Sequence, residues 1–139
     1  MIEEEKSCKE RIKAHYQSRM DEVRNLWNLY RENPEAYHDE YGRWDEYGLA
    51  FDYVKPGTFE GQKRGYWRYQ ISWGGPSDEF RFYCDENYGT TKIEYCFMDW
   101  FDGASCCVKG KNRQLWEEIW SDWLDCELPQ SKKSEAEAD

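Results

Sequence analysis

A change in hydrophobic period along the chain is the feature that most constrains its fold. Between Leu49 and Met98 apolar and polar residues alternate, which is typical of strands that bury one face. The alternation falls in four segments, at residues 49–54, 66–73, 78–84 and 91–98. Because short turns separate the last three segments, they can pair only as antiparallel neighbours, with the first strand added at one edge. The sequence therefore predicts a four-stranded, mostly antiparallel sheet.

Segments with a helical period flank the alternating region on both sides. Residues 3–31 and residues 112–125 carry apolar side chains at steps of three and four, which places them on one face of a helix. Since the strands have one apolar face, both helices should cover that face. The predicted fold class is thus α+β, with N-terminal and C-terminal helices packed on one side of the sheet. The strand residues expected beneath them are Trp67, Tyr69, Ile71, Trp73, Phe80, Phe82, Ile93, Tyr95 and Phe97.

Three further segments complete the predicted organisation. Pro34 suits the first position of a second, short helix over residues 35–41. Residues 99–111 are expected to form a loop. The end of the chain has no apolar side chain larger than alanine after its proline, so it should not fold. We therefore predict one α+β domain over residues 1–128 and a disordered acidic tail over residues 129–139.

The start of the chain and its cysteines favour a protein of the cytoplasm. The chain begins with the acidic, polar stretch Met1–Lys6, whereas a secretory signal needs a basic start followed by an apolar stretch. No apolar run in the sequence approaches the roughly 20 residues of a membrane span. The six cysteines are irregularly spaced, and Cys84 and Cys96 fall within expected strands. This distribution favours reduced thiols over disulfides.

The sequence contains no recognisable catalytic motif. Its two histidines, His15 and His38, lie on expected helices among charged residues, and no GxSxG, P-loop or HExxH pattern occurs. A cysteine–histidine nucleophile pair stays open, because such partners need only be close in space. We expect a protein that is not an enzyme and that uses no cofactor.

Two sets of residues could bind a metal ion. Four cysteines could in principle form a zinc site: Cys84, Cys96, Cys106 and Cys107. Structural zinc sites usually show cysteine pairs two to four residues apart, and directly adjacent cysteines do not easily bind one tetrahedral ion. Asp99 and Asp102 could bind a hard cation through oxygen ligands, or they could cap the turn after a strand. We expect no metal site from either set.

The outer face of the predicted sheet has some features of an RNA-binding surface. Residues that could stack on or bond to unpaired bases are Tyr66, Arg68, Arg81 and Tyr83. However, Glu79 and Glu94 share that face, and the formal net charge of the chain is −10. This charge disfavours direct binding to nucleic acid or to anionic membranes and favours a basic protein partner.

Acidic residues gather in two stretches, and the first stretch also contains aromatic residues. Aromatic rings anchor protein interfaces, and carboxylates steer a basic partner. The alternative is that each stretch is simply a solvated face, as most charge runs are. The residues expected to bind a partner are Glu35, Tyr37, Asp39, Glu40, Tyr41, Trp44, Asp45, Glu46, Glu118, Asp122 and Asp125.

The central third of the chain resembles a group of other sequences. WRYQISWGGPSDEFRFY, at residues 67–83, and IEYCFMDWFDGA, at residues 93–104, resemble small uncharacterised proteins of bacteriophages and mobile elements. Small acidic proteins of such sources are often antagonists of host defence, of the anti-restriction or anti-CRISPR kind. The resemblance implies a bacterial host cell and assigns no functional residues.

Three functions follow from these observations. The first is an inhibitor of a nucleic-acid-handling defence complex, a CRISPR or restriction effector, that occupies a basic surface of its target. The second is an immunity protein that neutralises a toxin through the same acidic contacts. The third is a small metal-dependent enzyme or ligand-binding module built on the loop that contains Asp99 and Asp102.

Overall fold

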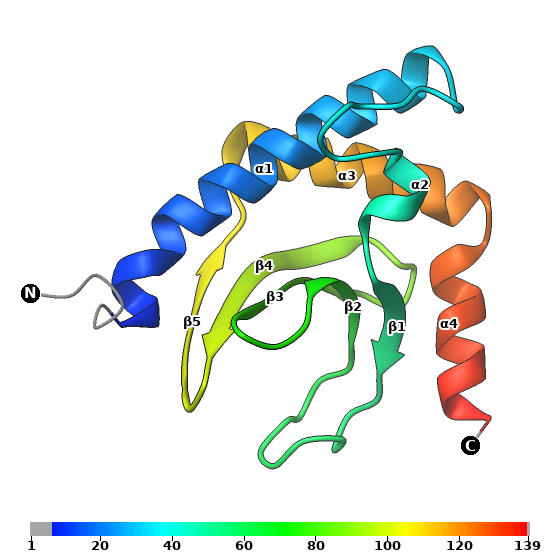
Figure 1. Ribbon diagram of the computed structural model, residues 1–139. Coiled ribbons are helices and arrows are strands. Elements are labelled where there is room, and N and C mark those ends of the chain that lie inside the picture. The colour runs from blue at the N-terminus through cyan, green and yellow to red at the C-terminus, as the bar shows by residue number, and fades with distance from the viewer. Residues whose placement is uncertain (1–6, 139) are drawn as a thin grey trace, which may run out of the picture.

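The computed structural model describes residues 7–138, and within them one antiparallel sheet has five strands in the order of the sequence (Figure 1). The strands are β1 (Ala50–Val54), β2 (Tyr66–Ser72), β3 (Ser77–Cys84), β4 (Thr90–Asp99) and β5 (Asp102–Cys107). Each strand pairs with its neighbour in sequence, so the predicted antiparallel meander is confirmed. Strand β1 lies at one edge, as expected.

Strand β5 corrects the prediction of a loop over residues 99–111 and of a sheet with four strands. It pairs with β4 along its whole length. Its sequence lacks the large β-branched and aromatic side chains that mark a half-buried strand. The residues that it turns toward the core, Ala104 and Cys106, are small. Backbone hydrogen bonds to the longer β4 therefore hold this edge strand in place.

The long helices α1 (Cys8–Glu32) and α3 (Gly110–Asp125) cover one face of the sheet, as predicted (Figure 1). Helix α1 begins at a capping box. The Ser7 hydroxyl accepts the backbone N–H of Glu10 at 3.3 Å, and the Glu10 carboxylate accepts that of Ser7 at 3.0 Å. Residues 3–6 of the predicted helix lie outside the described part of the chain. Of the helices in residues 7–138, none combines the length and apolar character that a membrane crossing requires.

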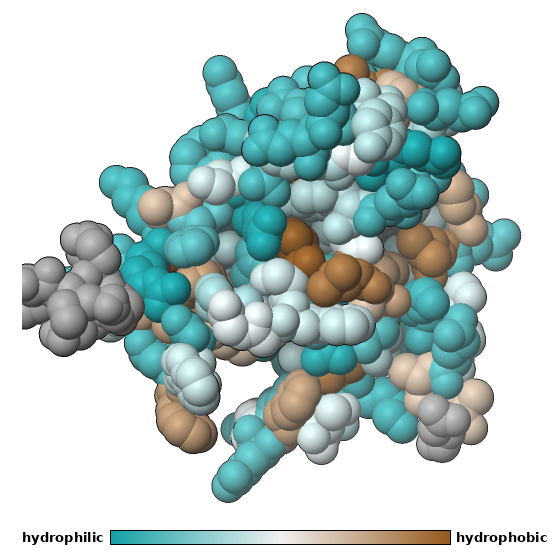
Figure 2. Space-filling model, viewed as in Figure 1, coloured by the Kyte–Doolittle hydropathy of each residue, from teal (hydrophilic) through white to brown (hydrophobic). Residues whose placement is uncertain are grey.

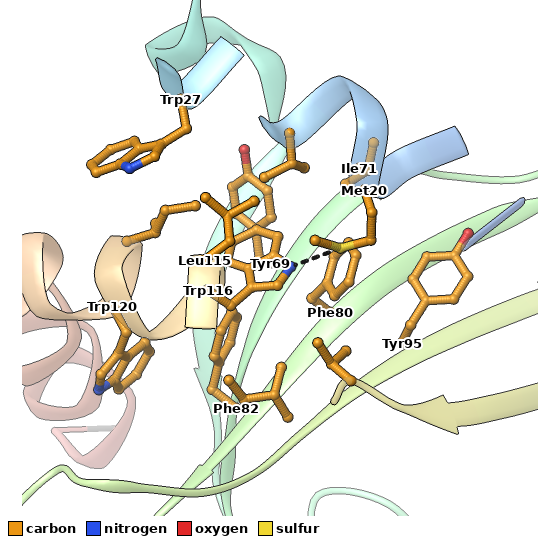
Figure 3. Packing of buried hydrophobic residues seen from close by; sticks show 14 of the residues in the cluster. Met20, Trp27, Tyr69, Ile71, Phe80, Phe82, Tyr95, Leu115, Trp116 and Trp120 are labelled. Atoms are coloured by element: carbon orange, nitrogen blue, oxygen red, sulfur yellow. Dashed lines mark hydrogen bonds between the residues drawn. The ribbon is translucent and has the colours of Figure 1, made fainter. Parts of the chain in front are cut away.

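Aromatic side chains fill the space between the sheet and the helices (Figure 3). Trp116 of α3 is fully buried, and its ring packs against Phe80 and Phe82 at centroid distances of 4.7 and 5.3 Å. Its indole N–H donates to the sulfur of Met20, on α1, at 3.3 Å. Aromatic pairs of this kind add about 0.5–1.5 kcal/mol beyond the burial of their area. Trp116 thus joins α3 to both α1 and the sheet.

Trp73 departs from the predicted inward face of the sheet. Strand β2 ends at Ser72, and the pairing of β2 with β3 shifts register between Gln70 and Ser72. An irregularity of this kind changes the direction in which the neighbouring side chains point. As a result, 59% of Trp73 is exposed, while the other strand residues expected to face the core are all buried.

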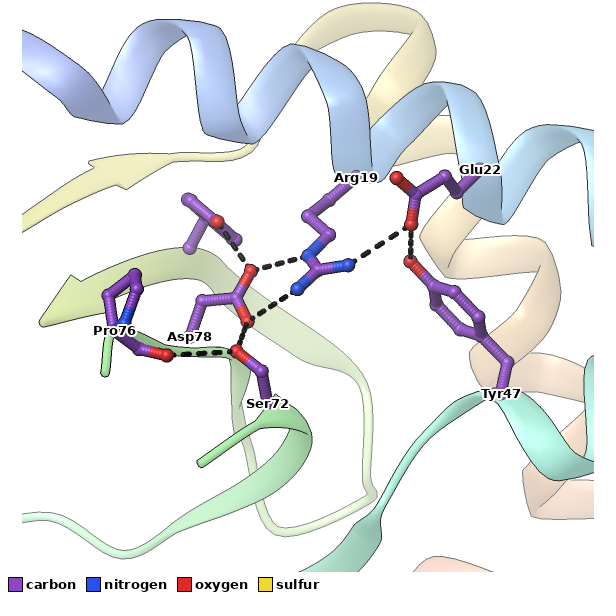
Figure 4. Close-up of polar contacts among 7 residues, drawn as sticks. Arg19, Glu22, Tyr47, Ser72, Pro76 and Asp78 are labelled. Atoms are coloured by element: carbon purple, nitrogen blue, oxygen red, sulfur yellow. Dashed lines mark hydrogen bonds and ion pairs between the residues drawn. The ribbon is translucent and has the colours of Figure 1, made fainter. Parts of the chain in front are cut away.

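A polar network crosses the interface between α1 and the sheet (Figure 4). Arg19 donates two hydrogen bonds to the buried Asp78, at 2.6 and 3.2 Å. Asp78 also accepts hydrogen bonds from Ser72 and Tyr95, both at 2.6 Å. Burial disfavours the ionised carboxyl, but these donors outweigh it and hold the pKa of Asp78 below its ordinary value. The network joins α1 to β2, β3 and β4 at one point.

The tail predicted to be disordered over residues 129–139 instead forms most of helix α4 (Leu128–Glu137). Residue 139 lies outside the described part of the chain. The helix packs beside β1 (Figure 1). Trp67 donates its indole N–H to the carbonyl of the buried Pro129 at 2.8 Å, and the ammonium of Lys133 lies over the ring of a β1 tyrosine at 5.7 Å. The prediction considered apolar side chains alone, whereas a carbonyl and a lysine stem hold this helix. The folded domain therefore includes α4.

Candidate protein-binding surface

The segment after α1 forms a tight turn rather than the short helix predicted over residues 35–41. His38 and Gly42 exchange backbone hydrogen bonds of 2.8 and 2.9 Å. The Nδ1 atom of His38 accepts the backbone N–H groups of Glu40 and Tyr41 at 3.0 and 3.2 Å. Gly42 has a φ of +81°, which glycine adopts without steric cost. The turn prevails because the imidazole satisfies backbone groups that a helix would otherwise pair.

The short helix α2 (Trp44–Tyr47) follows this turn and anchors it to the core. Trp44 is 7% exposed and packs edge-on against Trp27 of α1 at 5.6 Å. Tyr47 donates a hydrogen bond of 2.5 Å to Glu22 of α1 (Figure 4). Burial and this hydrogen bond raise the pKa of Tyr47. Trp44, which the sequence interpretation placed among the surface anchors, is therefore a core residue.

Helix α3 presents the carboxylates of Glu118, Asp122 and Asp125 beside the end of α1. Glu118 accepts the indole N–H of Trp27 at 2.6 Å and pairs with Arg31 at 2.9 Å. Among residues 7–138, neither Asp122 nor Asp125 has an ion-pair partner. Burial and the neighbouring charge of Asp125 raise the pKa of Asp122. Glu118 is thus engaged within the protein, while the other two carboxylates can receive an external cation.

Two hollows that share Tyr30 and Asp122 form what we call the acidic groove. Their volumes are about 390 and 550 Å³. The first hollow is also lined by Trp44, Asp45, Leu49, Phe51 and Trp123. The second is also lined by Trp27, Arg31, Pro34, Glu118, Ser121 and Asp125. The fold therefore brings the carboxylates of α2 and α3, which are far apart in sequence, to one groove.

The other predicted binding residues lie on the turn and on α2, outside the groove. Tyr37 is 66% exposed, and Tyr41 stacks on His38 with ring centroids 4.4 Å apart. The residues of this set with exposed carboxylates are Glu35, Asp39, Glu40 and Glu46. Figure 2 shows that mostly hydrophilic residues cover the upper right end of the molecule, where Figure 1 places the turn.

Asp45 is the predicted residue that links the turn region to the groove. It pairs with Arg43 at 2.8 Å, and this hydrogen-bonded arginine lowers the pKa of Asp45. Its carboxylate is therefore partly neutralised within the protein.

The two aspartates considered for a metal site have partners within the protein. Arg11 pairs with Asp99 at 2.6 Å, and the backbone N–H of Cys8 donates to Asp102 at 2.7 Å. Both aspartates thus hold the start of α1 against the β4–β5 hairpin. Across residues 7–138, no three histidine, cysteine or acidic side chains are grouped so that they could hold a metal ion. All six cysteines are free thiols in the structure.

The basic residues on the outer face of the sheet are paired with its acids. Arg81 pairs with the buried Glu79 at 2.7 Å and lies over the ring of Tyr66 at 4.8 Å. Arg68 pairs with Asp52 at 2.8 Å. The face is therefore a mixed layer of ion pairs and tyrosines, and it differs from the basic stacking platform that binds single-stranded nucleic acid.

Sequence reasoning missed several lining residues of the groove and one exposed apolar tip. Tyr30 and Trp123 belong to helix patterns that predict burial, so no local signal marks them as groove residues. Trp100 and Phe101 form the turn of the β4–β5 hairpin, where Trp100 is 90% exposed with a φ of +59° and Phe101 is fully exposed. This tip projects at the lower left in Figures 1 and 2. A Trp-Phe pair between aspartates is the signal that could have found it.

Comparison of the chain with protein-family models, with curated proteins and with solved structures finds no match. The acidic groove is therefore interpreted from its own chemistry. That chemistry consists of aromatic rings, two carboxylates without a cation among the described residues, and a strongly acidic chain.

Proposed function

We propose that this protein binds a basic surface of another protein through the acidic groove and the neighbouring turn. The partner that we favour is a nucleic-acid-handling defence complex of a bacterial host, of the CRISPR or restriction kind. By occupying the basic surface, the protein would block nucleic acid binding and so inhibit the complex. It would act in the cytoplasm of the host cell and without catalysis.

The observation that carries the proposal is that carboxylates from two distant segments line one groove. Asp45 of α2 and Asp122 of α3 both line the first hollow, and Asp125 lines the second. Because the pKa of Asp122 is raised in the folded protein, its ionised carboxylate lowers the free energy of unfolding.

The charge of the whole chain supports the same proposal. A formal net charge of −10 attracts a basic surface over distances longer than a direct contact. Such steering raises the association rate, and the attraction weakens as added salt screens it. The exposed ring of Tyr37 and the half-buried ring of Tyr30 offer contact area of the kind that anchors interfaces.

Affinity capture from a bacterial lysate, followed by competition with DNA, tests the proposal. The double variant Asp122→Asn/Asp125→Asn is compared with Glu60→Gln/Glu86→Gln, which removes the same charge from exposed loop positions. We expect the wild type and the control to retain a nucleic-acid-binding complex at low salt and to displace DNA from it. The groove variant should bind at least about tenfold more weakly, a loss of about 1.4 kcal/mol.

Capture of no such complex, or equal displacement of DNA by both variants and the wild type, would contradict the proposal. If the retained protein is instead a toxin whose activity is lost on binding, the protein is an immunity protein. The two outcomes are separated by assaying the captured partner for DNA binding and for toxicity.

A further inference from the structure

The first hollow of the acidic groove combines aromatic rings with carboxylates. Trp123 packs against Phe51 and Tyr69, with ring centroids 4.7 and 5.5 Å away, and Trp44 stacks near it at 6.5 Å. All four residues line the hollow. An apolar floor of this kind does not suit a small hydrated ion. It suits a ligand that has both an apolar stem and a positive charge.

The charges around the groove leave a position for one more cation. Arg31, which lines the second hollow, is already paired with Glu118 at 2.9 Å, and Arg43 is paired with Asp45 at 2.8 Å. Asp122 lines both hollows and has no ion-pair partner among the described residues. Asp125, about one helical turn later, adds a second negative charge to the same wall. A cation placed there would offset the burial and the repulsion that act on Asp122.

We propose that the acidic groove receives an arginine side chain of the partner protein, with its guanidinium between Asp122 and Tyr30. This inference rests on the proposed function and names the chemical group that the same site binds. Tyr30 lines both hollows, and its stacking on Trp27 at 5.4 Å fixes its ring where a ligand in either hollow can contact it.

Arginine fits this arrangement better than lysine does. A guanidinium is planar, so it can stack on an aromatic ring while it donates two parallel hydrogen bonds to a carboxylate. The ammonium of lysine is a compact, strongly hydrated charge that lacks this geometry. The methylene stem of arginine would lie on the apolar floor of the first hollow.

Other occupants fit the groove less well. A second copy of the chain carries the same net charge of −10, so two acidic grooves would repel one another. Hard metal ions prefer several oxygen ligands, whereas rings make up much of this lining. An arginine of a basic partner satisfies both the rings and the carboxylates.

NMR titration of isotope-labelled protein with three blocked tripeptides tests the inference. The probes are acetyl-Gly-Arg-Gly-amide, its lysine counterpart, and its citrulline counterpart, which keeps the shape of arginine without the charge. We expect the arginine peptide to shift the signals of Tyr30 and Trp123. It should bind more tightly than the lysine peptide and at least about tenfold more tightly than the citrulline peptide. In the complex, the Asp122 carboxyl should titrate at lower pH than in the free protein.

Matched variants complete the experiment. Asp122→Asn should weaken binding of the arginine peptide to the level of the citrulline peptide, and Glu60→Gln should leave it unchanged. Equal binding of all three peptides, the absence of shifts at tens of millimolar arginine peptide, or binding that Asp122→Asn does not affect overturns the inference. An octalysine peptide separates the two proposals. If it binds the acidic surface while the arginine peptide does not, the proposed function stands without the arginine site; if neither binds, both fail.

Discussion

The guanidinium of Arg19 holds the carboxylate of Asp78 through two hydrogen bonds, at 2.6 and 3.2 Å, across the interface between α1 and the sheet. Asp78→Asn should destabilise the protein by about 3 kcal/mol, because it leaves a partly buried guanidinium without its charged partner. Urea unfolding monitored by circular dichroism measures the loss. The control is Asp52→Asn, which removes the more exposed partner of Arg68 and should cost less than about 1 kcal/mol. Similar losses of unfolding free energy in both variants would mean that the buried ion pair of Asp78 contributes no more to stability than the exposed pair of Asp52.

The same carboxylate predicts how stability depends on pH. Because hydrogen bonds hold the pKa of Asp78 below its unfolded value, its contribution is fully present above pH ~4 and is lost as pH falls through the folded pKa. The stability difference between the wild type and Asp78→Asn should therefore shrink between pH 7 and pH 3. Unfolding free energies of both proteins at the two pH values provide the measurement. A difference that stays constant would show that ionisation of Asp78 does not stabilise the fold.

Asp122 should show the opposite behaviour. Its pKa is raised in the folded protein, so the ionised form destabilises the fold above that pKa, and the penalty disappears as pH falls. Asp122→Asn should therefore raise the thermal midpoint at pH 7 and leave it unchanged near pH 3. Glu60→Gln, on an exposed loop, is the control and should have little effect at either pH. A lower midpoint for Asp122→Asn at pH 7 would show that the carboxylate supports the fold.

Trp100 predicts a stabilising substitution at the tip of the β4–β5 hairpin. Its φ of +59° strains any residue that has a Cβ atom, and its side chain is 90% exposed. Trp100→Gly should therefore raise the unfolding free energy by up to about 1 kcal/mol, because glycine adopts this conformation without steric cost. Trp100→Ala keeps the strain and should stay within about 0.5 kcal/mol of the wild type. A loss of stability in both variants would reveal contacts of the indole ring that outweigh the strain.

Removal of α4 tests whether the end of the chain belongs to the folded domain. A chain that ends at Glu127 loses the Pro129 carbonyl and leaves the buried indole N–H of Trp67 without an acceptor. We expect it to lose at least about 2 kcal/mol of stability. A chain that ends at Glu135 keeps this hydrogen bond and should lose less than about 0.5 kcal/mol. Equal stability of the two shortened chains would restore the prediction of a disordered tail.

Large side chains made most of the fold predictable from the sequence. The rings of Phe80, Phe82 and Trp116 repeat at the strand and helix periods, and the structure buries all three. Strand β5 and helix α4 lack such side chains, and they are held through backbone groups and a lysine stem. Contacts of that kind depend on where a distant partner lies, which no local pattern records.

The candidate groove was predictable only in part for a related reason. The spacing of Asp122 and Asp125 predicts that they share one side of α3, and in the structure both line the second hollow. Their meeting with Asp45 depends on α2, which the burial of Trp44 docks against α1 and α3. The tight turn at His38 depends on an imidazole that accepts two backbone amides. Both features arise from tertiary contacts rather than from periodicity.

The order of the strands has a consequence for how the chain folds. Because spatial order repeats sequence order, each strand pairing closes a short loop, which costs little entropy and forms quickly. Helix α1 differs, since the hydrogen bond from Cys8 to Asp102 joins residues 94 positions apart. We expect the hairpins to form early and α1 to dock late. Substitutions at the interface of α1 with the sheet should then accelerate unfolding while they leave the folding rate nearly unchanged.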